Sequence, residues 1–178
     1  IVPAQMFEVP VRIKNTMDPK AHGTLISVEK DTEAAEKAIA AKDHITAIKV
    51  KSNRMVMAYG FLRRVFEVFE KYRTPIDMIT TSEIAVSLTI DNNEHLREIK
   101  EEISQYATVE VDKDQTIICI VGDLIAERKG VGSAIFEALD DIPIRMISYG
   151  GSRNNISLLV PQEYKKDSLV KLHKALFK

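Results

Sequence analysis

The apolar and polar positions of this chain follow two periods, and their order predicts a β-α-β-β-α-β unit. Apolar residues recur at the helical period between Phe61 and Phe69, which predicts a helix that ends before Pro75. Strict alternation from Ile84 to Ile90 predicts a strand with one face on a core. The other expected elements of this unit are strands at residues 55–57, 76–81 and 108–111 and a helix with its buried stripe at residues 96, 99 and 103.

The same order of elements recurs further along the chain, which indicates a duplication. Gly60 stands six residues before Phe66, just as Gly130 stands six residues before Phe136. Residues 75–80 (PIDMIT) are echoed by residues 143–148 (PIRMIS). We therefore expect two small ferredoxin-like domains, called here the first and second repeat, rather than one large domain. The elements expected in the second repeat are strands at residues 117–121, 144–148 and 156–160 and helices at residues 131–139 and 169–176.

The second repeat lacks a fourth strand, whereas the strand expected at residues 45–50 is surplus to the first repeat. We expect this strand to cross over and complete the second repeat's sheet, so that the first repeat is inserted within the second. The fold class is then α+β with two βαββαβ domains. The expected boundaries are residues 1–44 for an N-terminal part, 53–112 for the first repeat, and 45–50 plus 115–178 for the second. Within the N-terminal part, strands are expected at residues 9–13 and 24–28 and an Ala-rich helix at residues 31–41.

Composition excludes several classes of function. The net charge of −1 offers no electrostatic attraction for nucleic acid or an anionic membrane. Aromatic residues are 6% and Trp is absent, which disfavours a platform for stacked bases. Cys119 is the only cysteine, so a disulfide framework within the chain is excluded. No apolar run reaches the roughly 18 residues of a membrane span, and we expect a cytoplasmic protein.

Signals for catalysis are weak throughout the sequence. The run Gly130–Ser133 lacks the spacing of a phosphate-binding loop, and Asp140 and Asp141 fit a solvated helix end. The four histidines share no ligand spacing with carboxylates. We therefore expect no catalytic residue, no metal site and no cofactor in this chain.

Signals for binding a small ligand are stronger. The helix start after Gly60 would expose backbone N–H groups that suit a carboxylate, and the carboxylate of Asp77 could accept an amine. Together they would complement one α-amino acid. The alternative is that Gly60 only permits a tight turn and that Asp77 is a surface residue. In the second repeat Arg145 replaces Asp77 and would repel an amine. The candidate ligand-binding residues are Met57, Ala58, Tyr59, Gly60, Phe61, Leu62, Asp77, Thr81, Ser82 and Glu83.

Three stretches carry a resemblance to one family. Gly60-Phe61-Leu62 followed by residues 76–83 (IDMITTSE) resembles the first ACT domain of aspartate kinases. Residues 145–152 (RMISYGGS), with 155–157 (NIS) and 172–177 (LHKALF), resemble the second. Residues 11–16 (VRIKNT), with Asp18, Pro19, Gly23 and Thr24, are similar to the end of that family's amino-acid-kinase domain.

The resemblance implies a regulatory fragment. Full-length enzymes of the family use ATP and magnesium to phosphorylate the β-carboxylate of aspartate. Their ACT pair binds an end product, often lysine or threonine, at a dimer interface and inhibits the kinase. The resemblance thus implies a homodimer and favours lysine as the effector. Met17 and Asp18 match a nucleotide-adjacent position, with Met17 where some relatives have Lys.

Two alternatives stay open beside the regulatory fragment. A free-standing amino-acid-binding module could serve another partner, although residues 9–28 would then have no evident use. A ferredoxin-like nucleic-acid binder is disfavoured by the charge and by the non-aromatic strand faces.

Overall fold

The N-terminal part of the chain is a small unit by itself. The structure, a computed structural model, describes residues 2–27, 36–52, 59–82 and 84–177, and the chain divides into residues 1–34 and 35–178. The first unit contains α1 (Val2–Met6) and the antiparallel strands β1 (Val11–Ile13) and β2 (Thr24–Ile26), which confirms strands within residues 9–13 and 24–28. Gly23 has a φ of +67°, and a Cβ there would lie 2.2 Å from the carbonyl oxygen of Ile13, so only glycine fits.

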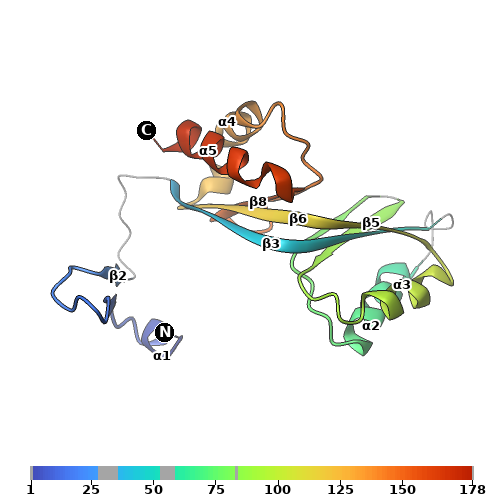
Figure 1. The fold of residues 1–178 in the computed structure, drawn as a ribbon. Helices are drawn as coiled ribbons and strands as arrows, with labels where there is room; N and C mark the ends of the chain where they lie inside the picture. The colour runs from blue at the N-terminus through green and yellow to red at the C-terminus, as the bar shows by residue number, and fades with distance from the viewer. Residues whose placement is uncertain (1, 28–35, 53–58, 83, 178) are drawn as a thin grey trace. The chain divides into compact units, whose positions relative to one another are not determined.

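The second unit is built on a six-stranded antiparallel sheet with the strand order β4-β5-β3-β6-β8-β7 (Figure 1). Two long strands, β3 (Glu36–Lys51) and β6 (Thr108–Gly122), run side by side along it. The remaining elements, in chain order, are α2 (Phe61–Lys71), β4 (Ile79–Thr81), β5 (Ala85–Ile90), α3 (Leu96–Ser104), η1 (Ile125–Glu127), α4 (Val131–Ala138), β7 (Met146–Tyr149), β8 (Asn155–Pro161), η2 (Gln162–Tyr164) and α5 (Lys165–Leu176).

The two long strands serve both halves of this unit. In the first half, which carries α2 and α3, residues 47–51 of β3 lie between β5 and residues 108–112 of β6. In the second half, which carries α4 and α5, the first residues of β3 pair with the end of β6, and β6 pairs with β8. The pairing of β3 with β6 shifts register between Lys42 and Ile45. We call this irregular stretch the junction.

Both strands bend their backbones at the junction. His44 in β3 has a φ of 58° and Asp114 in β6 has a φ of 54°. Left-handed backbone is uncommon for residues other than glycine, and Asp and His are among those that tolerate it best. These two residues therefore mark the point at which one half of the sheet gives way to the other.

Two expectations about β3 were wrong. Residues 36–41 form a strand rather than the end of an Ala-rich helix, because pairing with β6 outweighs a weak local helix propensity. Residues 45–50 belong to the first half, and it is residues 36–42 that complete the second half's sheet. Residues 36–44 are accordingly part of the second unit and not of the N-terminal part. The strands expected at residues 108–111 and 117–121 are one continuous strand, β6.

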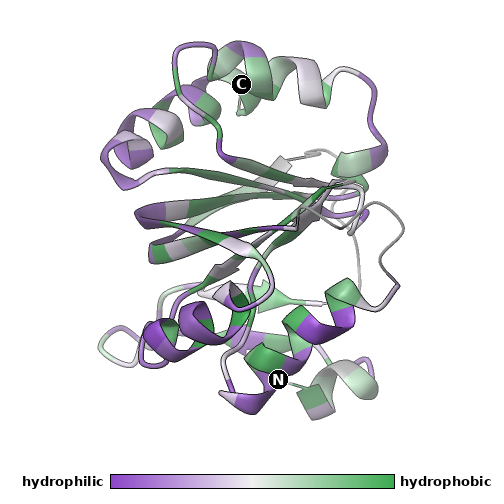
Figure 2. Ribbon diagram, turned by 90° about the vertical axis from the view of Figure 1, so that its right-hand side faces the viewer, coloured by the Kyte–Doolittle hydropathy of each residue, from purple (hydrophilic) through white to green (hydrophobic). Residues whose placement is uncertain are grey.

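The helices expected within the two repeats are present. The helix predicted from residue 61 is α2, whose Val65 and Phe69 are buried against Val86 and Leu88 of β5. The core of the second half is built in the same way from α4, α5 and the strands beneath them. Figure 2 shows the strands, largely hydrophobic, between two layers of helices. The strand predicted at residues 55–57 lies outside the described residues.

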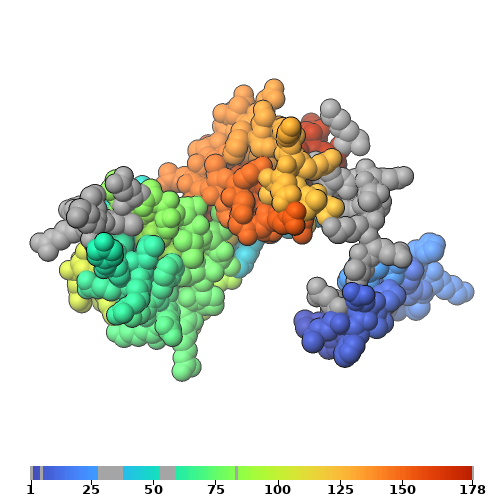
Figure 3. Space-filling model, turned by 180° about the vertical axis from the view of Figure 1, so that it is seen from behind, coloured from blue at the N-terminus to red at the C-terminus, as the bar shows by residue number. Residues whose placement is uncertain are grey.

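A third apolar cluster joins the two halves. Ile45 and Met78 of the first half pack with Ile117, Met146 and Leu159 of the second. All five side chains are at most 8% exposed. Figure 3 shows the two halves, green and orange, as adjoining lobes. Around the junction, the helix-free sheet face of each half thus packs against that of the other half.

Candidate functional site

The start of α2 has glycine at the N-cap position. Gly60 precedes the helix with a φ of 80° and has no side chain that could cap it. A Cβ at Gly60 would meet nothing within 4 Å, so the positive φ alone favours glycine there. The carbonyl oxygen of Gly60 accepts a hydrogen bond from the N–H of Arg64 at 3.1 Å. The N–H groups of the first turn have no carbonyl one turn earlier, and they can bind an anion.

The side chains at this helix start divide into anchored and accessible ones. Phe61 is 8% exposed, and its ring lies edge-on to Tyr106 with the ring centroids 6.3 Å apart. Tyr59 is fully exposed and Leu62 is partly exposed. Phe61 therefore fixes the helix end to the core, while Tyr59 and Leu62 face outward.

The turn between β4 and β5 holds two further candidates. Thr81 is the exposed last residue of β4. Ser82 donates its backbone N–H to the carbonyl oxygen of Ala85 at 2.8 Å and so closes the turn. The predicted site residues Met57, Ala58 and Glu83 lie outside the described residues.

Asp77 lies just before β4, and its carboxylate holds an ammonium group. Asp77 Oδ1 accepts a hydrogen bond from Lys42 Nζ at 2.7 Å, and Asp91 Oδ2 lies 2.7 Å from the same nitrogen. The hydrogen bond to Asp77 raises the pKa of Lys42, and the one from Lys42 lowers the pKa of Asp91. Neither partner could be recognised from the sequence, because both lie far from Asp77 along the chain, Lys42 by 35 residues.

Within one chain Asp77 and the start of α2 lie at opposite ends of the first half. Strand β4 and residues 46–51 of β3 are both antiparallel to β5, so they run in the same direction. Asp77 therefore lies at the end where this part of β3 begins. The start of α2 contacts Tyr106, which precedes β6 beside Lys51, at the end where this part of β3 finishes. The structure brings Gly60 to the same end as Thr81 and Ser82, and it does not bring Asp77 to them.

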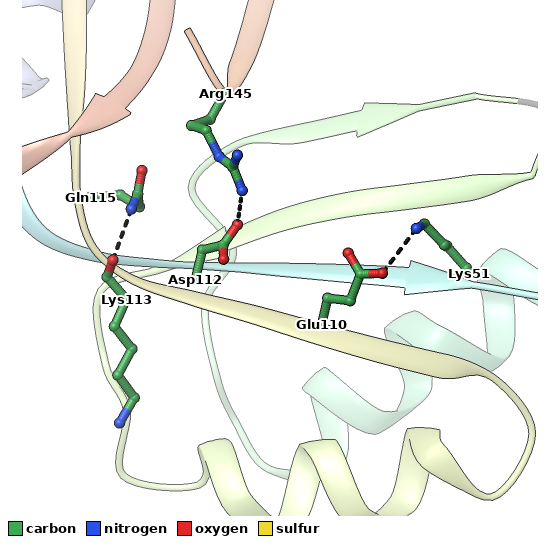
Figure 4. Close-up of polar contacts among 6 residues, drawn as sticks. All are labelled: Lys51, Glu110, Asp112, Lys113, Gln115 and Arg145. Carbon is green, nitrogen blue, oxygen red and sulfur yellow. Dashed lines mark hydrogen bonds and ion pairs between the residues drawn. The ribbon is translucent and has the colours of Figure 1, made fainter. Parts of the chain in front are cut away.

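The second half carries a related pair with the charges reversed. Arg145, which precedes β7, forms an ion pair with Asp112 on β6 (Figure 4). The backbone N–H of Arg145 donates to the carbonyl oxygen of Leu159 at 2.8 Å, as that of Asp77 donates to Thr89 at 2.9 Å. On the face of β6 that carries Asp112, Glu110 forms an ion pair with Lys51 at 2.9 Å (Figure 4). Arg145 therefore makes the second half's equivalent of the Asp77 position suitable for an anion and not for an amine.

The N-terminal unit places Met17 and Asp18 in a tight turn between β1 and β2. The side-chain oxygen of Asn15 accepts a hydrogen bond from the N–H of Met17 at 3.0 Å, and its carbonyl oxygen accepts one from the N–H of Asp18 at 3.1 Å. Met17 is 90% exposed. Over the described parts of the chain, no group of three or more His, Cys, Asp or Glu side chains could hold a metal ion. In those same parts no helix is long and apolar enough to cross a membrane.

Comparison with known proteins identifies both repeats. The family described as "ACT domain" matches residues 48–97 and 118–176. The chain is 31% identical over 185 residues to lysine-sensitive aspartokinase 3 of Escherichia coli, covering 99% of this chain and 41% of that protein. It is also 34% identical over 192 residues to the chloroplastic aspartokinase 1 of Arabidopsis thaliana, covering 98% of this chain and 33% of that protein. The chain belongs to the C-terminal regulatory ACT domains of aspartokinases.

Solved structures of aspartokinases share the fold. A C-terminal regulatory domain of aspartate kinase from Porphyromonas gingivalis is 50% identical, with a TM-score of 0.72 over 79% of this chain and 97% of that one. E. coli aspartokinase III in complex with aspartate and ADP is 32% identical, with a TM-score of 0.89 over 99% of this chain and 41% of that one. The chain spans about two fifths or less of the length of the curated aspartokinases named above. Its second unit is an α+β ACT domain pair, as the sequence predicts.

Proposed function

We propose that this ACT pair binds lysine and thereby inhibits an aspartokinase, which phosphorylates aspartate with ATP and magnesium. The observation that carries the proposal is the ammonium group of Lys42, which lies 2.7 Å from the carboxylates of both Asp77 and Asp91. This position suits a primary amine. The related E. coli aspartokinase 3 is named lysine-sensitive, and E. coli aspartokinase III has been solved in complex with lysine and aspartate, which supports lysine over threonine.

The N-terminal unit is proposed to be the end of the kinase domain, with Met17 and Asp18 near the nucleotide. The match to the E. coli enzyme covers 99% of this chain and so includes this unit, which a free-standing amino-acid-binding module would not need. We assign residues 45–112 to the first ACT domain and residues 36–42 plus 115–177 to the second, so that the first is inserted in the second. This chain by itself should show no phosphorylation of aspartate, because the groups that position ATP phosphates lie elsewhere in the enzyme.

The effector site is proposed to form between two protomers. Strand β4 is an edge of the sheet among the described strands, and an open edge is a template for pairing with another chain. Two β4 strands paired antiparallel about a two-fold axis at Thr80 would place Asp77 of one protomer opposite residues 81–83 of the other. The two ends of the predicted site would then meet across the interface. Exposed apolar side chains of this half fit such an interface: Tyr59, Leu62, Ile79 and Ile84.

The test is the melting temperature of the chain as a function of lysine concentration. A ligand that binds only the native state raises the melting temperature, and we expect lysine to do so while threonine and methionine do so less. Asp77→Asn removes the charge that accepts the amine, and it should abolish the lysine-dependent shift. Asp112→Asn is the matched control, since it removes a carboxylate from an ion pair in the same ACT pair. An equal shift in wild type and Asp77→Asn would place the amine elsewhere.

A further inference from the structure

Lys42 links the two ACT domains through its side chain. Its backbone belongs to the second half, where Lys42 pairs with Ile117 of β6. Its ammonium group reaches across the junction to Asp77 and Asp91 of the first half. The carboxylates proposed to receive the effector's amine are therefore occupied by an amine of the same chain.

The equivalent position in the other domain shows what this contact does structurally. Asp112 corresponds to Lys42. Across strands β3 and β6, Asp112 pairs with Ala47 and Lys42 pairs with Ile117. Ala47 and Ile117 stand at equivalent places in their domains, so their partners are equivalent as well. Asp112 likewise reaches across the junction, to Arg145. Among the described residues, Lys42 with its two carboxylate partners and Asp112 with Arg145 tie the ACT domains together. Of these two contacts, the one at Lys42 holds an ammonium group that a free amino acid could replace.

We infer that Lys42 is a tethered competitor for the effector's amine, so that binding of a primary-ammonium ligand at Asp77 and Asp91 breaks the two ion pairs that Lys42 makes across the junction. This inference rests on the proposed function and adds a specificity-determining residue to it. It also supplies what an allosteric signal requires, a contact that differs between two states. The ligand binds better to the state in which Lys42 no longer pairs with Asp77 and Asp91.

The geometry makes this exchange feasible. The side chains of Lys42, Asp77 and Asp91 are 47%, 26% and 42% exposed, so a ligand can reach the carboxylates and Lys42 can turn to water. Ion pairs between exposed side chains are weak, because solvent screens them and two flexible side chains must be held in place. Asp77 and Asp91 would keep two negative charges around the incoming ammonium group once Lys42 leaves. The site therefore selects a ligand whose amine is charged.

The test measures the dissociation constant of L-lysine for the 178-residue chain by calorimetric titration. Lys42→Met removes the competing ammonium but keeps an unbranched side chain of similar length. We expect it to bind lysine roughly three- to ten-fold more tightly than wild type. Lys42→Arg keeps a competing cation, so its affinity should stay close to that of wild type. A role for Lys42 in stability alone would lower the melting temperature of Lys42→Met without tightening its affinity for lysine.

Arg145→Met is the matched control, because it breaks the equivalent ion pair across the junction without touching Asp77. We expect its dissociation constant to stay within about two-fold of wild type. If Lys42→Met binds lysine no more tightly than wild type, or if Arg145→Met tightens binding as much, the competitor role is overturned. If neither wild type nor Lys42→Met binds lysine, the proposed function itself is overturned and this inference falls with it.

Discussion

Asp77 and Arg145 occupy equivalent positions in the two ACT domains and carry opposite charges. Each side chain pairs with a residue of the other domain, Asp77 with Lys42 and Arg145 with Asp112. The first domain supplies the carboxylates of Asp77 and Asp112, and the second supplies the cations of Lys42 and Arg145, so each contact joins opposite charges. Two copies of either domain in the same arrangement would bring like charges together. The reversal therefore favours pairing of the first domain with the second.

A charge exchange tests this complementarity. Arg145→Asp puts two carboxylates together and should lower the free energy of unfolding by about 0.5–1 kcal/mol, which is the size expected for an exposed pair. The double variant Arg145→Asp, Asp112→Arg restores opposite charges and should recover most of the loss. Urea denaturation of wild type, both single variants and the double variant gives the coupling energy. A coupling energy indistinguishable from zero would show that the pair does not hold the domains together.

Gly60 and Gly132 should respond in opposite directions to replacement by alanine. Gly60 has a φ of 80°, so Gly60→Ala should cost about 1–2 kcal/mol through strain even though space for the methyl group is free. Gly132 lies within α4, where a Cβ would make ordinary contacts at 3.9 and 4.0 Å with Phe136 and Tyr149. Gly132→Ala should therefore raise the melting temperature, because alanine is the better helix former. Equal effects of the two substitutions in thermal unfolding would contradict the assigned backbone conformations.

Two phenylalanines on helices provide a comparison for the core. Phe69 in α2 is 2% exposed and Phe136 in α4 is 41% exposed. Phe69→Ala should lower the free energy of unfolding by about 3–5 kcal/mol, because it removes a buried ring and leaves a cavity. Phe136→Ala should cost well under half of that in the same denaturation experiment. Similar losses for both would mean that Phe136 is covered in solution by another surface, such as a second protomer.

The helices could be predicted from the sequence because their signals are local. In α2 the apolar stripe recurs every three to four residues and Pro75 follows the helix, so a short window is enough. Strand β3 could not be predicted in the same way. Its first residues are rich in alanine and favour a helix locally, and they pair with residues 117–122 far along the chain. That pairing is visible only once the sheet is assembled.

The candidate site was predictable residue by residue but not as an arrangement. Glycine at position 60 and a carboxylate at position 77 each suggest a chemical role from residue type and place in a motif. Their location at opposite ends of the sheet follows from strand direction, and strand direction depends on which strands pair. Lys42 carries no local signal at all, because an exposed lysine in a strand is ordinary. Its role depends on contacts with Asp77 and Asp91, which are distant in sequence.

Acid should destabilise the ACT pair below about pH 4. Hydrogen bonds from cationic side chains lower the pKa of six carboxyl groups: Asp43, Asp91, Glu102, Glu110, Glu127 and Asp141. A carboxyl with a lowered pKa in the folded state stabilises that state above its unfolded pKa, about 4, and loses this effect as the pH falls through the folded value. The melting temperature should therefore be nearly constant from pH 7 to about 5 and fall below about 4. High salt at neutral pH should also lower it slightly by screening the same pairs. A melting temperature that rises on acidification would contradict these pairings.

The two open edges of the sheet should differ in their importance for dimerisation. Strand β4 carries the exposed Ile79 and β7 carries the exposed Ile147 at the equivalent position. If β4 forms the proposed interface, Ile79→Lys places two charges near the two-fold axis and should convert the dimer to a monomer, because charged residues on an edge strand oppose pairing. Ile147→Lys adds the same charge at the other edge and should leave the dimer intact. Light scattering across a range of protein concentrations distinguishes these outcomes.

Because the proposed effector site needs residues from both protomers, Ile79→Lys should also lose the lysine-dependent rise in melting temperature, whereas Ile147→Lys should retain it. Dimers that survive Ile79→Lys and dissociate with Ile147→Lys would move the interface to β7.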